Sequence, residues 1–296
     1  MATATKQTNK KRNFLFGTDP EFALRNLNNQ IVSAIPVLNR SKHDPIDLRS
    51  GHKIYFDNVL VEANIAPAKN KGDLLRKLKS LYRKSQKVLN GHKLSATASH
   101  DFDPVECMHD EAMKFGCDPE LDVYEGRSAY PPQGVGQFRS AGGHIHIGGI
   151  TNKTVYEKSD LVVLMDILVG IPAVIMDNDP TSVARKQLYG KAGRFRNTNY
   201  GIEYRTLGNF WLSNPELASV IYDLTILAAK TWENDEAAAL FALVDQEQVI
   251  NAINNGDKEL AKTILDKLPI EDNLKNRIVE LSNNAYDGDI FKNWAV

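Results

Sequence analysis

Five short stretches of the chain each place two polar residues two positions apart. The pairs are Asp19/Glu21, Glu62/Asn64, Asp118/Glu120, His144/His146 and Glu203/Arg205. A spacing of two is the period of a β-strand, so both members of a pair are expected on the same face of a sheet. Carboxylates, imidazoles and an arginine on one face would be costly to bury as a core. They suit a divalent cation and a phosphate instead.

Several of these residues are suitable ligands for a hard cation. Mg²⁺ prefers oxygen ligands and usually keeps substrate phosphates in its coordination shell. The candidate ligands are Glu21, Glu62, Glu120, His144 and Glu203. A single strand carboxylate is usually a surface residue, and a His-x-His pair also occurs in zinc and iron enzymes and in ordinary packing. Their joint occurrence, together with a nearby Glu-x-Arg, favours a metal site.

The segment YGKAGRFR (189–196) carries basic residues between glycines. Glycine lets the backbone approach a ligand closely, and Lys191, Arg194 and Arg196 would suit the phosphates of a nucleoside triphosphate. The segment by itself fits a solvated loop equally well. The chain contains neither a GxxxxGK[ST] nor a GxSxG motif, which argues against a Walker-type nucleotide site and a serine hydrolase.

The overall composition is that of an ordinary globular protein. The 296 residues are 42% hydrophobic and 25% charged, and the net charge of −1 gives no electrostatic argument for nucleic acid binding. Cys107 and Cys117 form no CxxC motif, and residues 1–13 are basic without a hydrophobic stretch. We therefore expect reduced thiols, a disordered tail rather than a signal peptide, and a cytoplasmic location.

Periodicity places the pairs on strands. Residues 14–26 read as a strand interrupted at Pro20, because proline removes a ladder donor. Residues 53–68 read as one strand that closes at Pro67, and the HIHIGG stretch as an interior strand. GCDPEL repeats the GTDPEF pattern. Residues 127–143 and 185–201 read as loops, and GIEYRTLGNFWL returns to a strand.

Other segments have the helical period. Residues 73–90 predict an amphipathic helix with a solvated basic face. The apolar run 161–176 is too short to cross a bilayer and predicts a buried helix pair bent at Pro172, opened by a capping box at Thr154-x-x-Glu157. From Pro215 onward the pattern is mostly helical, with breaks at 254–256 and near Pro269.

The motifs in this order resemble a known family. GTDPEF, VEANIAP, GCDPEL, RSAGGHIHIGG, YGKAGRFR and GIEYRTLGNFWL together resemble the phage-type (phiEco32-like) amidoligases of type 2. These are carboxylate–amine ligases of the glutamine synthetase and glutamate–cysteine ligase superfamily. The resemblance covers residues 14–214 and implies an α+β fold with a curved antiparallel sheet of the glutamine synthetase catalytic type, flanked by helices. Residues 14–214 would form the catalytic domain, and residues 215–296 a helical region packed on it.

The resemblance also implies roles for individual residues. Glu21, Glu62, His144 and Glu203 would bind two or three Mg²⁺ ions, with Mn²⁺ as a possible substitute, and Glu120 is assigned to the same metal set within the phage-type branch. Arg205 would face the transferred phosphoryl group. The nucleotide would contact His146, Arg139, Lys191, Arg194 and Arg196. Asp19 or Asp118, if free of metal, would accept the proton that the amine loses.

The implied reaction has two steps. A substrate carboxylate attacks the γ-phosphate of ATP to give an acyl phosphate, and an amine then displaces phosphate to form an amide. The substrates would be a small-molecule or peptide carboxylate and amine, with no nucleic acid or membrane partner and with a homo-oligomer possible. A phage origin would place the protein in the host cytoplasm.

Two other functions fit the same residues. One is a metal-dependent hydrolase or oxygenase that uses the histidines and carboxylates without a nucleotide. The other is a non-catalytic binding protein that kept the fold. The second alternative is disfavoured, because a protein without a reaction has little reason to keep costly charges on one face.

Overall fold

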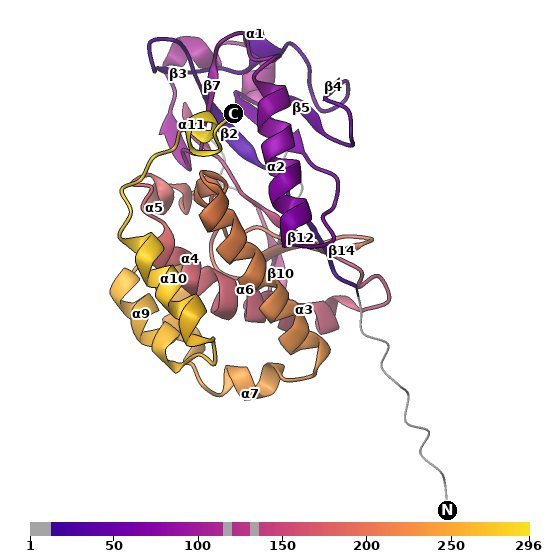
Figure 1. Ribbon diagram of the computed structural model, residues 1–296, viewed down its shortest axis with the longest axis vertical. Coiled ribbons are helices and arrows are strands. Elements are labelled where there is room, and N and C mark those ends of the chain that lie inside the picture. Colours follow the sequence, from indigo (N-terminus) through magenta and orange to yellow (C-terminus); the bar gives the residue numbers. More distant parts are fainter. Residues whose placement is uncertain (1–12, 115–119, 131–135) are drawn as a thin grey trace, which may run out of the picture.

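The computed structural model describes residues 13–114, 120–130 and 136–296 (Figure 1). A first six-stranded sheet lies at its centre. Its strands, in spatial order, are β1 (Leu15–Gly17), β12 (Ile145–Gly148), β14 (Gly201–Tyr204), β13 (Arg194–Asn197), β9 (Glu120–Asp122) and β10 (Arg127–Ala129). Every pair of neighbouring strands in this sheet is antiparallel.

A second antiparallel sheet continues from the first. Its strands are β3 (Ile31–Val32), β2 (Glu21–Arg25), β6 (Leu60–Asn64), β5 (Lys53–Asp57) and β4 (Ile46–Asp47), with β7 (Lys93–Ser95) also paired to β2. A separate two-stranded ladder joins β8 (Ser99–Asp101) to β11 (Phe138–Ser140). The two large sheets, joined through β1 and β2, form a curled antiparallel half-barrel, so the predicted mixed fold with a curved antiparallel sheet is confirmed at this level.

The link between β1 and β2 explains where the sheets separate. Pro20 has no N–H to donate, as expected from the sequence. The neighbouring groups bond outside their own strand: Glu21 N donates to Gly142 O at 3.0 Å, and Ala63 N donates to Pro20 O at 3.0 Å. The polar pairs therefore lie where two sheets meet and not on a single sheet face.

Four of the predicted segments are divided differently in the structure. The strand predicted at GIEYRTLGNFWL is β14 followed by a 3₁₀ turn at Asn209–Leu212. Residues 53–68 form the β5–β6 hairpin and not one strand, because Asn58 adopts a φ of 54° and reverses the chain. Residues 127–143, predicted as a loop, contain β10 and β11. Residues 185–201, also predicted as a loop, contain β13. Strands of three or four residues carry too little periodicity to be recognised.

Helices cover the outside of the half-barrel (Figure 1). α2 (Lys71–Ser85) confirms the predicted amphipathic helix. It begins at Asn70, whose side chain accepts from Asp73 N at 2.9 Å, and it buries Leu74, Leu78 and Tyr82. Short helical turns occur elsewhere, at α1 (Ile35–Leu38), η1 (Pro104–Cys107), η2 (Asp110–Met113), α5 (Ser182–Arg185) and η4 (Asn209–Leu212).

The apolar run forms one continuous helix rather than the predicted pair. α3 (Val155–Met165) opens with the predicted capping box at Thr154 and Glu157, passes through a π-helical turn (Asp166–Gly170) and continues as α4 (Ile171–Met176). The π-turn accommodates Pro172, which cannot donate to a helical bond. The helix Val155–Met176 is long and apolar enough to cross a membrane by length and composition, contrary to the expectation from residues 161–176 alone. However, 83% of its most apolar window is buried inside the protein.

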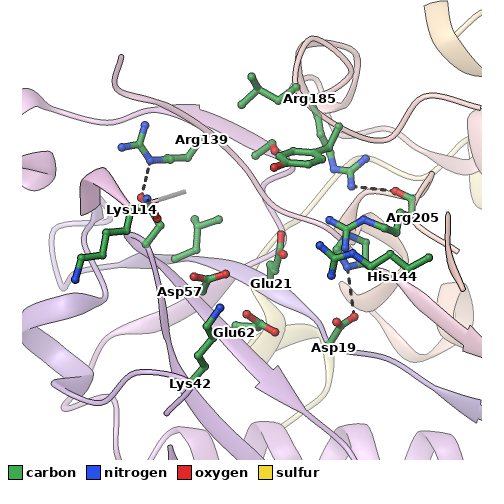
Figure 2. A pocket seen from close by; sticks show the side chains of 16 residues that line it. Asp19, Glu21, Lys42, Asp57, Glu62, Lys114, Arg139, His144, Arg185 and Arg205 are labelled. Atoms are coloured by element: carbon green, nitrogen blue, oxygen red, sulfur yellow. Dashed lines mark hydrogen bonds and ion pairs between the residues drawn. The ribbon is translucent and has the colours of Figure 1, made fainter. Parts of the chain in front are cut away.

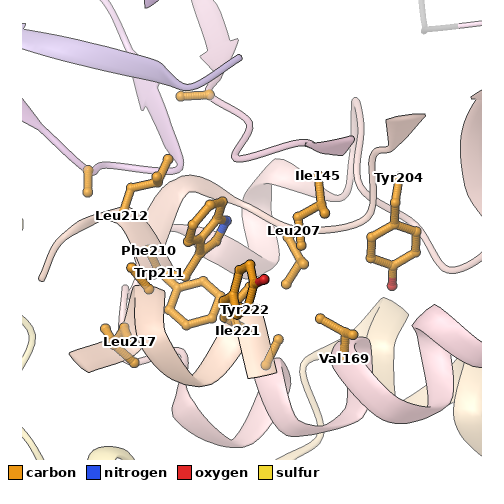
Figure 3. Close-up of a cluster of buried hydrophobic side chains, with 14 of the residues drawn as sticks. Ile145, Val169, Tyr204, Leu207, Phe210, Trp211, Leu212, Leu217, Ile221 and Tyr222 are labelled. Carbon is orange, nitrogen blue, oxygen red and sulfur yellow. The ribbon is translucent and has the colours of Figure 1, made fainter. Parts of the chain in front are cut away.

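The C-terminal region is helical, as predicted. Its helices are α6 (Pro215–Glu233), α7 (Ala237–Phe241), α8 (Gln246–Asn255), α9 (Lys258–Lys267), α10 (Asp272–Ser282) and α11 (Ile290–Asn293). The expected breaks fall at Gly256, which has a φ of 64°, and at Pro269, between α9 and α10. α6 packs against α3, and its apolar face joins η4 and the first sheet in a buried aromatic cluster (Figure 3).

Candidate functional site

A cavity of about 270 Å³ opens where the two sheets meet (Figure 2). Its lining carries both signs of charge from both sheets. The charged residues around it are Asp19, Glu21, Lys42, Asp57, Glu62, Lys114, Arg139, His144, Arg185, Arg196 and Arg205. Four of the five motif pairs identified in the sequence contribute to this cavity or to its immediate support. Asp118, the first member of the remaining pair, lies outside the described residues.

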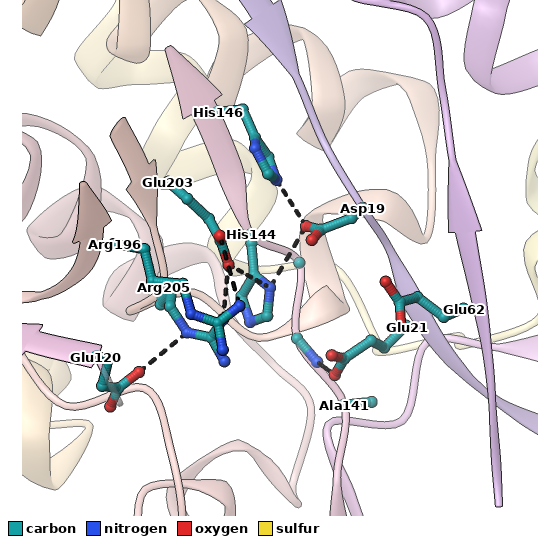
Figure 4. A network of polar contacts seen from close by, with 12 residues as sticks. Asp19, Glu21, Glu62, Glu120, Ala141, His144, His146, Arg196, Glu203 and Arg205 are labelled. Carbon is teal, nitrogen blue, oxygen red and sulfur yellow. Dashed lines mark hydrogen bonds and ion pairs between the residues drawn. The ribbon is translucent and has the colours of Figure 1, made fainter. Parts of the chain in front are cut away.

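One end of the cavity brings together a histidine and two carboxylates. The Nδ1 atom of His144 lies 3.4 Å from Oδ1 of Asp19 and 3.5 Å from Oε1 of Glu203 (Figure 4). Ligand atoms of these three residues all lie within 4.8 Å of one another. In the described part of the chain, the buried Nδ1 atom has no hydrogen-bond partner. A buried ring nitrogen without a hydrogen-bond partner beside two carboxylates fits a divalent cation.

Gly142 fixes the orientation of His144. A Cβ atom at Gly142 would approach Nε2 of His144 to 2.3 Å, so this ring edge packs against the backbone and Nδ1 faces the carboxylates. The amide N of Gly142 also donates to Oε2 of Glu21 at 2.6 Å. One glycine therefore supports residues from both sheets.

His146 supports Asp19 from the neighbouring position. Its Nε2 atom lies 2.9 Å from Oδ1 of Asp19, and its Nδ1 atom lies 2.5 Å from the hydroxyl of Tyr200. Burial alone would raise the pKa of Asp19, but the charges of His146 and His144 hold that pKa well below its usual range. Burial would likewise lower the pKa of His146, but Asp19 raises it above its ordinary value. Asp19 therefore stays ionised and oriented.

Arg205 occupies the centre of an ionic network on the first sheet. It donates through Nη1 to Oε1 of Glu203 at 2.6 Å and through Nε to Oε2 of Glu120 at 2.9 Å. Burial would lower the pKa of Arg205, but Glu203 and Glu120 raise it, so the guanidinium is a permanent cation. Arg194 lies 3.7 Å from Glu120, and Arg196 lies 3.8 Å from Glu203. Glu120 is thus placed with arginines and not beside His144.

The second sheet contributes an acidic wall, which we define as Glu21, Asp57 and Glu62. Glu21 and Glu62 face each other in the register of β2 and β6, and Tyr55 donates to Oε1 of Glu62 at 2.7 Å. Burial raises the pKa of both glutamates, and Asp19, Glu21 and Asp57 raise that of Glu62 further. Within the described ranges, none of the three acids forms an ion pair with a lysine or arginine. This wall fits a second cation.

Of three basic residues predicted to contact the nucleotide, two line the cavity and one does not. Arg139 lines the cavity, but its guanidinium donates to Asn58 Oδ1 at 2.6 Å, to Gly136 O at 2.7 Å and to Ala112 O at 2.9 Å. Arg196 lines the cavity directly. Lys191 is exposed and does not line it.

Arg185 is a site residue that the sequence analysis did not select. Its buried guanidinium donates to Ala141 O at 3.0 Å, Thr206 O at 3.2 Å and Arg205 O at 3.3 Å. Gly190, with a φ of 83°, leaves the room that this side chain fills. The glycines of YGKAGRFR indicated a close approach of the backbone, but the sequence did not indicate that Arg185 fills the space beside Gly190.

Asp166 holds the basic loop against the first sheet. This buried carboxylate accepts from Gly193 N at 2.6 Å, Tyr204 Oη at 2.6 Å and Tyr124 Oη at 2.9 Å. Burial raises the pKa of Asp166 to about 6. The sequence showed Asp166 only as a polar interruption of an apolar run. It is in fact a tether between that helix and the loop that precedes β13.

Comparison with known proteins identifies the family of this chain. The family model described as "Phage phiEco32-like COOH.NH2 ligase-type 2" matches residues 133–282. Among solved structures, a bifunctional glutathione synthetase from Pasteurella multocida aligns with a TM-score of 0.41 and 10% identity, over 96% of this chain and 48% of that chain. The chain thus spans about half the length of that relative. No curated protein matches. Because the family model covers half of the sequence, the chain belongs to the phage phiEco32-like carboxylate–amine ligases of type 2.

Proposed function

We propose that this ligase uses ATP and Mg²⁺ to join a carboxylate to an amine through an acyl phosphate. The observation that carries the proposal is the arrangement of the cavity. Asp19, His144 and Glu203 form a cation-binding set at one end, and Arg205 and Arg185 place fixed positive charge beside it. Such a combination suits the phosphates of a nucleoside triphosphate with its cations.

We assign the residues to two cation positions. Asp19, His144 and Glu203 would hold one Mg²⁺, and Glu21 with Glu62 would supply carboxylates to another. Bound Mg²⁺ would neutralise the phosphates and withdraw charge from the phosphorus. In this assignment Asp19 serves as a ligand rather than as the base suggested by the sequence, because His144 and His146 both face its carboxylate. Ligands from β2, β6, β14, the β1–β2 link and the residue before β12 support a sheet of the glutamine synthetase catalytic type.

The chain's own residues would then guide two displacements. An oxygen of the substrate carboxylate attacks the γ-phosphorus, the bond to the β-phosphate oxygen breaks, and ADP leaves. Arg205, kept charged by Glu203 and Glu120, stabilises the negative charge that spreads over the phosphoryl oxygens. The amine nitrogen next attacks the acyl carbon, and phosphate leaves as the amide forms. Asp57, the acid of the wall that is not assigned to a cation, would attract a cationic amine and accept the proton that the amine loses before it attacks.

The test is an ADP-release assay with purified protein. It screens pairs of amino acids and amines, and mass spectrometry identifies the product. We expect release to require Mg²⁺, ATP, a carboxylate and an amine together. Arg205→Lys should lower kcat by about 10²–10³-fold, whereas Arg127→Lys, at an exposed arginine paired with Glu125, should leave it unchanged. Product formation without nucleotide would instead identify a metal-dependent hydrolase or oxygenase.

A further inference from the structure

A second cavity, of about 280 Å³, lies behind the candidate active site. It is lined by residues from the end of α4, from α5, from the chain after β14 and from the turn between α8 and α9. No residue lines both cavities. Arg185 and Arg205 line the first, whereas their neighbours in sequence, Lys186 and Thr206, line the second.

The second cavity carries opposite charges that do not neutralise each other. Asp177 accepts a hydrogen bond from Asp179 N at 3.0 Å, and the Ser182 hydroxyl also faces its carboxylate and lowers its pKa against the effect of burial. Lys186 donates to Gly190 O at 2.7 Å, and Lys258 donates to Asn178 Oδ1 at 2.5 Å. Across the part of the chain that the structure describes, no ion pair joins Asp177 to Lys186 or Lys258. The carboxylate and the ammonium groups thus line one cavity at a distance.

The surroundings make this separation costly. Burial raises the pKa of Asp177 to about 6 and lowers the pKa of Lys186 to about 7. Asp179 does not compensate the lysines directly, because its carboxylate is occupied by Ala98 N at 2.7 Å and Thr181 N at 2.9 Å. A ligand with one positive and one negative group would pair with both sides of the cavity.

The lining also has an apolar part, beside the polar side chains of Asn178, Ser182 and Thr206. The apolar part includes Ala173, Val174, Leu207, Phe210 and Ile253, all of which are buried. An inorganic anion would use only the lysines, and a cation only Asp177. A zwitterion with a hydrocarbon side chain would use the lysines, the aspartate and the apolar floor together.

We propose that this second cavity is a binding site for a free α-amino acid with an aliphatic side chain. Lys186 and Lys258 receive its carboxylate, Asp177 receives its ammonium group, and the side chain lies on Val174 and Ile253. The site is separate from the candidate active site, and the proposal does not depend on the ligase reaction.

Calorimetric titration and thermal-shift measurements with L-leucine test this proposal. We expect L-leucine to bind the full-length protein and to raise Tm. 3-Methylbutylamine, which lacks the carboxylate, and 4-methylpentanoate, which lacks the amine, should each bind at least 10-fold more weakly. Absence of L-leucine binding, or equal binding of either analogue, would overturn the proposal.

Variants separate this cavity from the active site. Asp177→Asn should weaken L-leucine binding by at least 10-fold, and Val174→Phe, which fills the cavity while keeping every charge, should abolish it. Both variants should still be stabilised by Mg²⁺–ATP, which reports that they are folded. Glu203→Gln should lose the Mg²⁺–ATP effect and keep the L-leucine effect. Retained binding in Val174→Phe, or lost binding in Glu203→Gln, would place the amino acid elsewhere and contradict the proposal.

Discussion

The two halves of the candidate active site handle their charges in different ways. On the first sheet, Glu203 and Glu120 are matched by Arg205 at 2.6 and 2.9 Å. On the second sheet, Glu21 accepts from a backbone amide and Glu62 from the Tyr55 hydroxyl. Among the residues that the structure describes, neither acid forms an ion pair with a lysine or arginine. The first half is therefore neutralised by the protein itself, and the second half is arranged for cations that come with a ligand.

This difference suggests a division of labour. The matched half keeps Arg205 oriented before substrate arrives, which is the condition for electrostatic stabilisation of a transition state. The unmatched half gains its charge balance only when cations bind, so its carboxylates should determine the metal requirement. Glu203 belongs to the first half but is also a candidate ligand of the other cation, so its substitution should lower both kcat and the affinity for Mg²⁺–ATP. Substitutions in the second half should mainly change the dependence on Mg²⁺.

The largest effect is expected for Glu203→Gln in the matched half. The variant loses a candidate metal ligand and also the acid that holds Nη1 of Arg205. We expect ADP release at saturating Mg²⁺ and ATP to fall by about 10³-fold. Glu125→Gln, at an exposed acid paired with Arg127 at 2.7 Å, is the matched control and should retain full activity. Near-normal turnover in Glu203→Gln would show that the Glu203–Arg205 pair of the first sheet has no part in the reaction.

A second prediction concerns Glu62→Gln in the unmatched half. We expect the concentration of Mg²⁺ for half-maximal activity to rise by about 10–100-fold, with a smaller change in kcat at saturating Mg²⁺. Burial raises the pKa of Glu62, so a cation that binds here competes with a proton, and apparent Mg²⁺ affinity should increase with pH. The measurement is a set of Mg²⁺ titrations of activity across pH.

Tyr55→Phe is the control for Glu62→Gln. It removes only the hydroxyl group that donates to Glu62 at 2.7 Å. The carboxylate remains available, so the Mg²⁺ requirement should change little. If Glu62→Gln and wild type gave superimposable Mg²⁺ titrations, the acidic wall would have no part in cation binding.

The motif residues could be identified from the sequence because their spacing is local. The strand period of two was enough to pair Glu203 with Arg205, and His144 with His146. The pairing of these motifs in space depends on register: His146 lies opposite Glu203, and Glu21 lies opposite Glu62. Register between residues 57 positions apart, as in the first pair, or 41 positions apart, as in the second, is not contained in any short pattern, so the separation into two sheets could not be foreseen.

Residues that act by supporting others were harder to find. Arg185 is on a four-residue helix and bonds only to backbone carbonyls, and no motif encodes such partners. In the sequence, Asp166 is visible only as one charged residue within an apolar run. Its partners Gly193 and Tyr204 come from other elements. Their roles follow from tertiary packing, which the sequence pattern does not contain.

Gly142→Ala tests the point where the two halves meet. The new Cβ would lie 2.3 Å from Nε2 of His144, so the imidazole must leave its present position beside Asp19 and Glu203. We expect Mg²⁺ affinity to fall by about 10-fold, measured by calorimetry in the presence of ATP. Gly72→Ala is the matched control, because its nearest neighbour would lie at 3.5 Å. Unchanged affinity in Gly142→Ala would show that the position of His144 is not critical.

The smallest effect on activity, and a distinct one on stability, is expected for Asp166→Asn. The pKa of Asp166 is about 6 in the folded protein, against 3.8 for the ordinary group, because the carboxyl is buried. Between about pH 4 and pH 6 the folded state holds a proton that the unfolded state has lost, so this group's contribution to stability falls as pH rises through that window. Above about pH 6 the loss is complete and amounts to at most about 3 kcal/mol.

Urea unfolding at several pH values measures this contribution. The free energy of unfolding of wild type minus that of Asp166→Asn should decrease between about pH 4 and pH 6 and be flat above that range. Asp160→Asn, on the exposed face of the same helix, should show no such window. Asp166 holds the loop before β13 in place and, within the described residues, does not hydrogen-bond to the charged residues that line the candidate active site. Asp166→Asn should therefore leave the Mg²⁺ requirement set by Glu62 unchanged, even where it lowers kcat by loosening the loop before β13. A shifted Mg²⁺ requirement in Asp166→Asn would mean that the two halves are mechanically coupled through the first sheet.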